Sequence, residues 1–119
     1  LIPHAEAEDR VMYPTVARVM GAPQATATMS RDHVEVGRLT EELESLRWQL
    51  RAGGLTPSVA RDLRRVLYGL YSLVRTHFAK EEEIYLPLLD AHLTPDEARQ
   101  MFHAMEEVAE AARARASWR

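Results

Sequence analysis

The fold of this chain is decided by the stretch Thr76-His77-Phe78-Ala79-Lys80-Glu81-Glu82-Glu83-Ile84-Tyr85-Leu86-Pro87. Its histidine and glutamate are four residues apart, which places them on one face of a helix, about 6 Å apart along its axis. The same face carries apolar residues at steps of three and four, namely Leu63, Val66, Leu70, Val74, Ile84 and Leu88. This periodicity predicts a face that points into a core. Because a buried glutamate is costly unless something pairs with it, Glu81 needs a partner.

The same pattern occurs near the start of the chain, in His4-Ala5-Glu6-Ala7-Glu8 followed by Val11-Met12-Tyr13-Pro14. An offset of 73 residues (77 − 4) aligns the histidines, the glutamates and the prolines of the two copies. One such pair can be a surface pair that stabilises a helix by only about 0.2–0.5 kcal/mol. Two aligned copies favour a shared chemical role.

Size and composition exclude several classes of protein. A chain of 119 residues forms one domain with a modest core. The net charge is −3 without a basic run, which argues against nucleic acid as a partner. The absence of cysteine excludes disulfides, iron–sulfur clusters and thiolate zinc sites. No apolar run reaches membrane-spanning length and no signal peptide is present, so we expect no membrane association and a cytoplasmic location.

The helix start and stop signals along the chain predict an all-α fold. The expected helices are residues 3 to about 20, about 25–52, 56 to about 91, and 95–116, separated by Gly21, by Gly53-Gly54 and by Thr94. Thr56 and Thr94 are predicted N-caps, each followed by proline at the first helical position. Short connections predict an antiparallel up-and-down bundle in a single domain, residues 1–119, with a motif-bearing core at 1–91 and an extra C-terminal helix.

Two prolines fall inside these helices. Pro14 should bend or loosen the backbone near Arg10, whose carbonyl its ring crowds, and Pro87 should disturb the third helix. The inward stripe of the first helix is predicted to include Val11, Thr15 and Val19. The second helix carries an inward stripe at Met29, His33, Val36, Thr40, Leu43, Leu46 and Leu50.

Five residues on the inward stripes are candidate metal ligands: His4, Glu8, His33, His77 and Glu81. Imidazole and carboxylate together suit iron, manganese or zinc. Two carboxylates from different helices can bridge two metal ions, which would resolve the burial of Glu8 and Glu81. The alternative for His33, taken alone, is a hydrogen-bonded core histidine.

These motifs, with the endings Met12-Tyr13-Pro14 and Tyr85-Leu86-Pro87, resemble the hemerythrin-like (HHE cation-binding) domain family over about residues 1–91. The resemblance implies an antiparallel four-helix bundle around a non-haem di-iron centre. There Glu8 and Glu81 would bridge the irons, and His4, His33 and His77 would be terminal ligands. Open coordination positions would accept oxygen, peroxide or nitric oxide.

The chain departs from the family pattern in two places. The family has a helix before the first motif that supplies another histidine, whereas this chain begins Leu1-Ile2-Pro3-His4, so we expect a fragment or processed chain without that helix. Gly37 stands where oxygen carriers have a second histidine, so the resemblance is to the bacterial type. His103, with Glu107 four residues on, is the only internal substitute for the absent ligand; otherwise it is a partly exposed helix residue.

Four residues that neighbour the ligands in the sequence are either candidates for orienting them or expected to be solvated. Asp32 and Tyr13 are candidates for orienting the ligands, and a solvated position is expected for Asp9 and Glu82. Core positions are expected for Met29, Phe78 and Tyr85.

The resemblance implies a di-iron protein that binds or senses O2, NO or peroxide. Alternatives are a peroxide- or NO-metabolising enzyme on the same centre, iron storage or handling, and a metal-free helical association module. The absent helix predicts an apolar groove and hence a homo-oligomer, for example a helix-exchanged dimer. Alternatively, the last helix folds back over the groove and covers Met101 and Met105.

Overall fold

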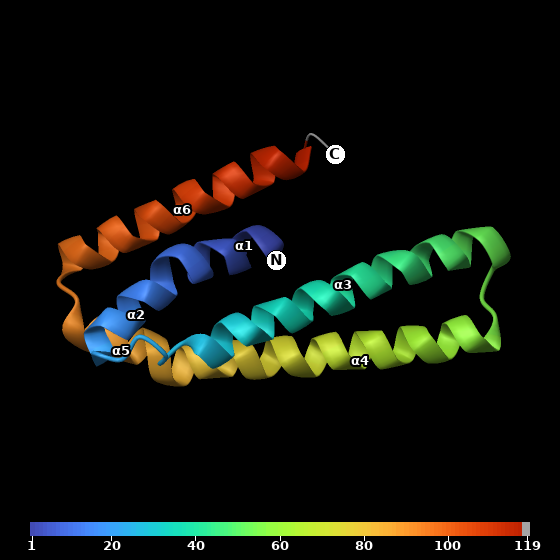
Figure 1. The fold of residues 1–119 in the computed structure, drawn as a ribbon, viewed down its shortest axis with the longest axis horizontal. Coiled ribbons are helices and arrows are strands. Elements are labelled where there is room, and N and C mark those ends of the chain that lie inside the picture. Colours follow the sequence, from blue (N-terminus) through green and yellow to red (C-terminus); the bar gives the residue numbers. More distant parts are fainter. Residues whose placement is uncertain (118–119) are drawn as a thin grey trace. The chain divides into compact units, whose positions relative to one another are not determined.

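The computed structural model describes residues 1–117, and within that range it contains helices and no strands (Figure 1). The elements are α1 (Ile2–Ala7), the π-helical segment η1 (Glu8–Met12), α2 (Tyr13–Met20), α3 (Ala27–Gly53), α4 (Pro57–Lys80), the π-helical segment η2 (Glu81–Tyr85), α5 (Leu86–His92) and α6 (Pro95–Ser117). The prediction of an all-α chain is confirmed. Trp118 and Arg119, the end of the predicted domain, lie outside the described residues.

The helix ends follow the predicted capping residues. Gly21 ends α2 with φ of 65°, in the left-handed region that glycine adopts without strain. Thr56 Oγ1 accepts a hydrogen bond from the backbone N–H of Val59 at 3.2 Å at the start of α4. At the start of α6, the Thr94 N–H donates to Glu97 Oε1 at 2.9 Å and the Glu97 N–H donates to Thr94 Oγ1 at 3.2 Å. This reciprocal capping box is the one that the sequence predicts.

The disturbance expected from each proline takes the form of a π-helical segment. In η1 the backbone N–H of Tyr13 donates to the carbonyl of Glu8, five residues back. In η2 the N–H of Leu86 donates to the carbonyl of Glu81 in the same way. Proline has no N–H and its ring crowds the carbonyl four residues earlier, so the turn before it widens. Each π-helical segment therefore begins at the motif glutamate.

The π-helical segments correct the predicted inward stripes. An α-helical period predicts Val11, Thr15 and Ile84 in the core, but Ile84 is 55% exposed and the other two are only partly buried. The buried positions are one residue further along, at Met12, Val16, Tyr85 and Leu89. A π turn accommodates an extra residue, so it rotates the following helix by about one residue relative to the expected register. The shift is the same in both copies, since Met12 aligns with Tyr85 and Val16 with Leu89 at the offset of 73.

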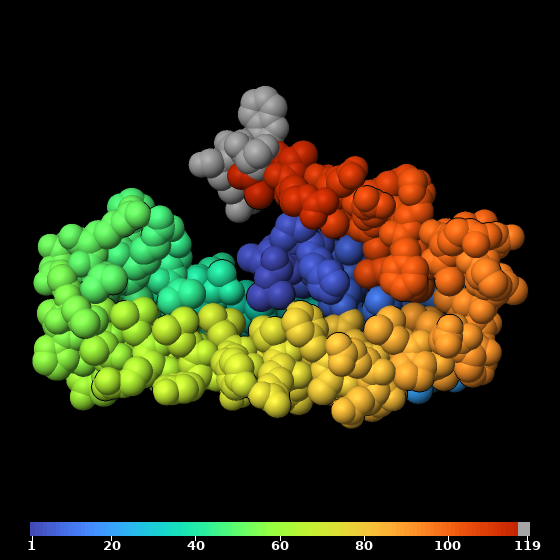
Figure 2. Space-filling model, turned by 180° about the vertical axis from the view of Figure 1, so that it is seen from behind, coloured from blue at the N-terminus to red at the C-terminus, as the bar shows by residue number. Residues whose placement is uncertain are grey.

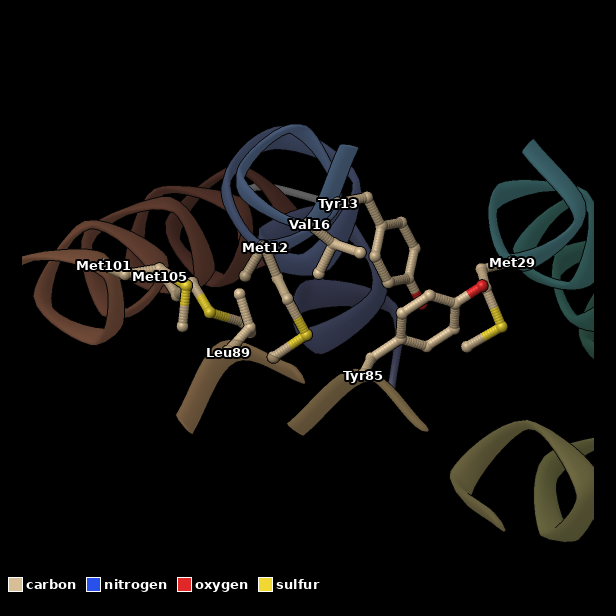
Figure 3. Packing of buried hydrophobic residues seen from close by; sticks show 9 residues of the cluster. Met12, Tyr13, Val16, Met29, Tyr85, Leu89, Met101 and Met105 are labelled. Carbon is tan, nitrogen blue, oxygen red and sulfur yellow. The ribbon is translucent and has the colours of Figure 1, made fainter. Parts of the chain in front are cut away.

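The chain divides into two compact units, one of residues 1–30 with the residues from 80 onward, and one of residues 31–79. In the first unit, shown in Figure 3, the core contains Met12, Tyr13, Val16, Met29, Tyr85, Leu89, Met101 and Met105. Within this unit α6 packs along α1 and η1, as Figures 1 and 2 both show. As a result Met101 and Met105 are buried. The C-terminal helix therefore folds back onto the N-terminal helix.

In the second unit α3 and α4 pack together through Leu39, Leu46 and Val66. An ion pair between Glu42 and Arg65 also joins the two helices. Two residues that were predicted to lie in the core are exposed. Phe78 is 41% exposed and Leu50 is 38% exposed. The prediction that Phe78 lies in the core is therefore wrong, whereas Met29 and Tyr85 are buried as expected.

Among the described residues, no helix is long and apolar enough to cross a membrane.

Candidate metal centre

Three of the predicted ligands come together in the first unit. Glu8 and Glu81 are the first residues of η1 and η2, and they are 1% and 6% exposed. His4 lies one turn before Glu8, and its Nε2 is 3.2 Å from Glu8 Oε2. His4, Glu8 and Glu81 each offer a ligand atom, and these atoms lie within 4.8 Å of one another. The His4 side chain is 56% exposed, so it borders solvent, whereas the sequence predicts it on a buried stripe.

The chemistry of this group fits a cation. Two carboxylates buried close together repel each other, and the repulsion is relieved by a proton or a positive ion between them. Carboxylate oxygens and an imidazole nitrogen are ligands of iron, manganese and zinc. The group therefore has the donor types and the spacing that a metal ion needs.

Tyr13 supports the buried carboxylate from one side. Its hydroxyl donates a hydrogen bond to Glu8 Oε1 at 3.2 Å, and both residues are almost fully buried. Burial, followed by the charges of Glu8 and Glu81, holds the pKa of Tyr13 far above its ordinary value. The phenol therefore stays protonated and remains a hydrogen-bond donor to Glu8. The sequence names Tyr13 as a candidate neighbour, and the structure shows the contact that it makes.

The other two predicted ligands come together in the second unit. His33 on α3 and His77 on α4 place their Nε2 atoms 3.0 Å apart, with ring centroids 4.7 Å apart. Two imidazole nitrogens about 2.1 Å from one ion, at right angles, are roughly 3 Å apart. The distance is that of a hydrogen bond between the two rings, and it also fits a pair of ligands on one metal ion. His77 Nδ1, on the other side of the ring, is 3.0 Å from Asp32 Oδ2.

The other residues that the sequence placed near the ligands lie at the surface. Asp9 is exposed and accepts a hydrogen bond from Ser30 Oγ at 2.8 Å, and Glu82 is exposed as expected. Ser30 was not identified from the sequence, because its contact spans 21 residues and no local pattern signals it. The His103 side chain is 73% exposed and pairs with Glu107 at 2.9 Å. It belongs to none of the candidate ligand groups in residues 1–117, so it is the exposed helix residue of the two alternatives.

A model of the hemerythrin HHE cation-binding domain matches residues 1–89. The chain belongs to this family. All five predicted ligands fall inside the matched range of the HHE domain, which covers most of the chain. The helical architecture and the histidine–glutamate groups agree with the cation binding for which the HHE domain is named. No curated protein and no solved structure matches the chain.

Proposed function

We propose that this HHE-domain chain is a non-haem di-iron protein that binds or senses O2, NO or peroxide. His4, Glu8, His33, His77 and Glu81 would hold the metal, with Glu8 and Glu81 as the bridging carboxylates. The proposal rests on the family match and on the two ligand groups described above. The main support is that Glu8 and Glu81 are both buried and that their ligand atoms lie within 4.8 Å of a ligand atom of His4.

The buried glutamates support a dinuclear site for a physical reason. Glu8 and Glu81 bring two carboxyl groups to buried positions, where they are 1% and 6% exposed. Iron ions would supply the compensating positive charge and, with open positions, the capacity to bind a small diatomic molecule or peroxide. The protein side chains would hold the metal, and Tyr13 would donate a hydrogen bond to Glu8 throughout.

The histidine pair supports a terminal role for imidazole. His33 and His77 come from different helices, yet their Nε2 atoms are 3.0 Å apart. A neutral imidazole binds a metal through an unprotonated nitrogen, so both Nε2 atoms could hold one ion once the proton of the hydrogen bond between them has left. We therefore assign His33 and His77 to the same iron. His4, which lies beside Glu8, would serve the other iron.

Metal analysis of the purified protein tests the proposal. After anaerobic loading with Fe(II) and desalting, the wild-type chain should retain a pair of irons. The variants His77→Ala and Glu81→Gln should lose most of the metal. His103→Ala is the matched control, because that histidine also has a carboxylate four residues on but lies on the surface. The proposal would be contradicted if the wild type retained no more iron than His77→Ala.

A second measurement separates binding from turnover. The iron-loaded protein should form a stable adduct with O2 or NO that is visible by absorption spectroscopy, without sustained consumption of peroxide. Rapid peroxide or NO turnover that disappears in His77→Ala would favour the enzymatic alternative. Retention of many irons per chain would favour iron storage. Homo-oligomer formation stays a prediction, which light scattering on the same samples would check.

A further inference from the structure

Asp32 forms a chain of close polar contacts with the two histidines of the second unit. Its Oδ2 is 3.0 Å from His77 Nδ1, and His77 Nε2 is in turn 3.0 Å from His33 Nε2. The side chains of His77 and Asp32 are 5% and 18% exposed, so water has little access to this contact. Asp32 and His33 are neighbours on α3, whereas His77 lies on α4. The contact therefore also joins the two helices.

Proton accounting assigns a direction to each of these hydrogen bonds. An ionised carboxylate only accepts hydrogen bonds, so with Asp32 ionised the proton of this contact lies on His77 Nδ1. A neutral imidazole carries one N–H, so His77 Nε2 is then unprotonated and acts as the acceptor in its contact with His33. The hydrogen bond between the rings must then be donated by the Nε2–H of His33. In this arrangement of protons, the contact with Asp32 favours one tautomer at each histidine.

We propose that Asp32 is a positioning residue that holds His77 in the Nδ1–H tautomer, so that the Nε2 lone pair is presented to a metal ion. Asp32 is not itself a metal ligand, and its role in metal binding rests on the proposed function. A consequence follows for His33. To bind the same ion, His33 must lose its Nε2 proton to solvent and take one from solvent at Nδ1, without a net change of charge.

The contacts of the other acidic residues distinguish Asp32 from them. Asp9 is exposed and takes its hydrogen bond from Ser30. Asp62, in the same unit as Asp32, lies 3.8 Å from Arg65 and is 44% exposed. A carboxylate that orients a metal-bound histidine typically raises metal affinity by about 10–100-fold. Asp32 has the geometry for this effect, and Asp62 provides a matched control.

The first experiment measures the tautomers in the metal-free protein. Long-range ¹H–¹⁵N spectra of histidine-labelled protein should show His77 protonated at Nδ1 only and His33 at Nε2 only. Asp32→Asn should remove this preference at His77, because an amide can donate to Nδ1 as well as accept from it. Asp62→Asn should leave both histidines unchanged. A wild-type His77 protonated at Nε2, or at both nitrogens, would overturn the inference.

The second experiment measures affinity for Zn(II), a diamagnetic probe that keeps the spectra readable. Competition with a chelator should show about 10–100-fold weaker binding for Asp32→Asn and no change for Asp62→Asn. Asp32→Glu should restore part of the affinity, because it restores the carboxylate. Circular dichroism and urea unfolding of each variant establish that the helices are intact. On loading the wild type, the remaining proton of His33 should move to Nδ1.

These two experiments separate the inference from the proposed function. If the wild type binds neither zinc nor iron, the proposed function fails, and the metal-free spectra still decide the role of Asp32. If the wild type binds metal and Asp32→Asn binds it equally tightly with unchanged tautomers, the positioning role is wrong and the metal centre stands. Unchanged tautomers with weaker binding would also overturn the inference, since the tautomer is the means by which Asp32 is proposed to act.

Discussion

Tyr13 donates a hydrogen bond to Glu8 across five residues of one helical segment. In a regular α-helix, residues five apart point in directions about 140° apart, because each residue turns the helix by roughly 100°. The π-helical segment η1 lies between them and brings both side chains to the same buried face. Pro14 follows directly, so the widened turn and the hydrogen bond have a common local cause.

Loss of this hydrogen bond should destabilise the protein. Tyr13→Phe leaves a buried carboxylate with one donor fewer, so we expect a loss of about 1.5–3 kcal/mol of unfolding free energy in the metal-free protein. Tyr85→Phe is the matched control, because the Tyr85 hydroxyl donates to a neutral acceptor, the carbonyl of Ala25, at 3.3 Å. That control should lose only about 0.5–1.5 kcal/mol. Urea denaturation measures both, and a loss in Tyr13→Phe no larger than in Tyr85→Phe would refute this account.

Removing one buried charge should separate metal retention from folding. In Glu81→Gln the repulsion between the two buried carboxylates disappears, so the metal-free variant should be at least as stable as the wild type to urea. The same variant should retain much less iron, because the amide is a weaker ligand and carries no charge. The matched change Glu82→Gln, at an exposed position, should alter neither property. A Glu81→Gln protein with full iron content would argue against a bridging role.

The one-residue shift of the buried face can be tested by chemical labelling. The chain contains no cysteine, so a single introduced cysteine reports on its own position. Ile84→Cys should react rapidly with a thiol reagent, since Ile84 is 55% exposed, whereas Leu89→Cys should react slowly, since Leu89 is 4% exposed. Both should react at the same rate in urea. Protection of residue 84 in the folded protein would show that the helix keeps the α-helical register.

The capping box at the start of α6 predicts a dependence of stability on pH. The backbone N–H of Thr94, followed by its side chain, holds the pKa of Glu97 below its ordinary value. A folded-state pKa that is lowered contributes stability above the unfolded pKa, and this contribution is lost as pH falls through the folded value.

Glu97→Gln keeps an acceptor for the Thr94 N–H but removes the titration. We therefore expect the wild type to be more stable than Glu97→Gln at neutral pH, with the difference shrinking in acid below the ordinary glutamate pKa. Thermal unfolding from neutral to acidic pH measures the difference. A difference that is constant across this range would contradict the assignment.

Local chemistry in the sequence was sufficient to predict the helices and their ends. Gly21, Thr56 and the Thr94–Glu97 box act through neighbouring backbone groups, so their effects do not depend on the rest of the fold. The two histidine–glutamate pairs were recognisable for the same reason, since four residues span one helical turn. These patterns also led to the HHE family, to which the chain belongs.

The tertiary structure decided which side chains are buried and what the candidate ligands contact. The periodicity predicted Ile84 inside, but the structure exposes Ile84 and buries Tyr85 and Leu89, which pack in one cluster with residues from distant parts of the chain. The sequence named Asp32 as a candidate for orienting a ligand, but it could not show that the ligand is His77, because the two residues are 45 positions apart and lie on different helices. Backbone hydrogen bonds and caps are determined within a few residues, whereas burial and ligand orientation depend on contacts between distant segments.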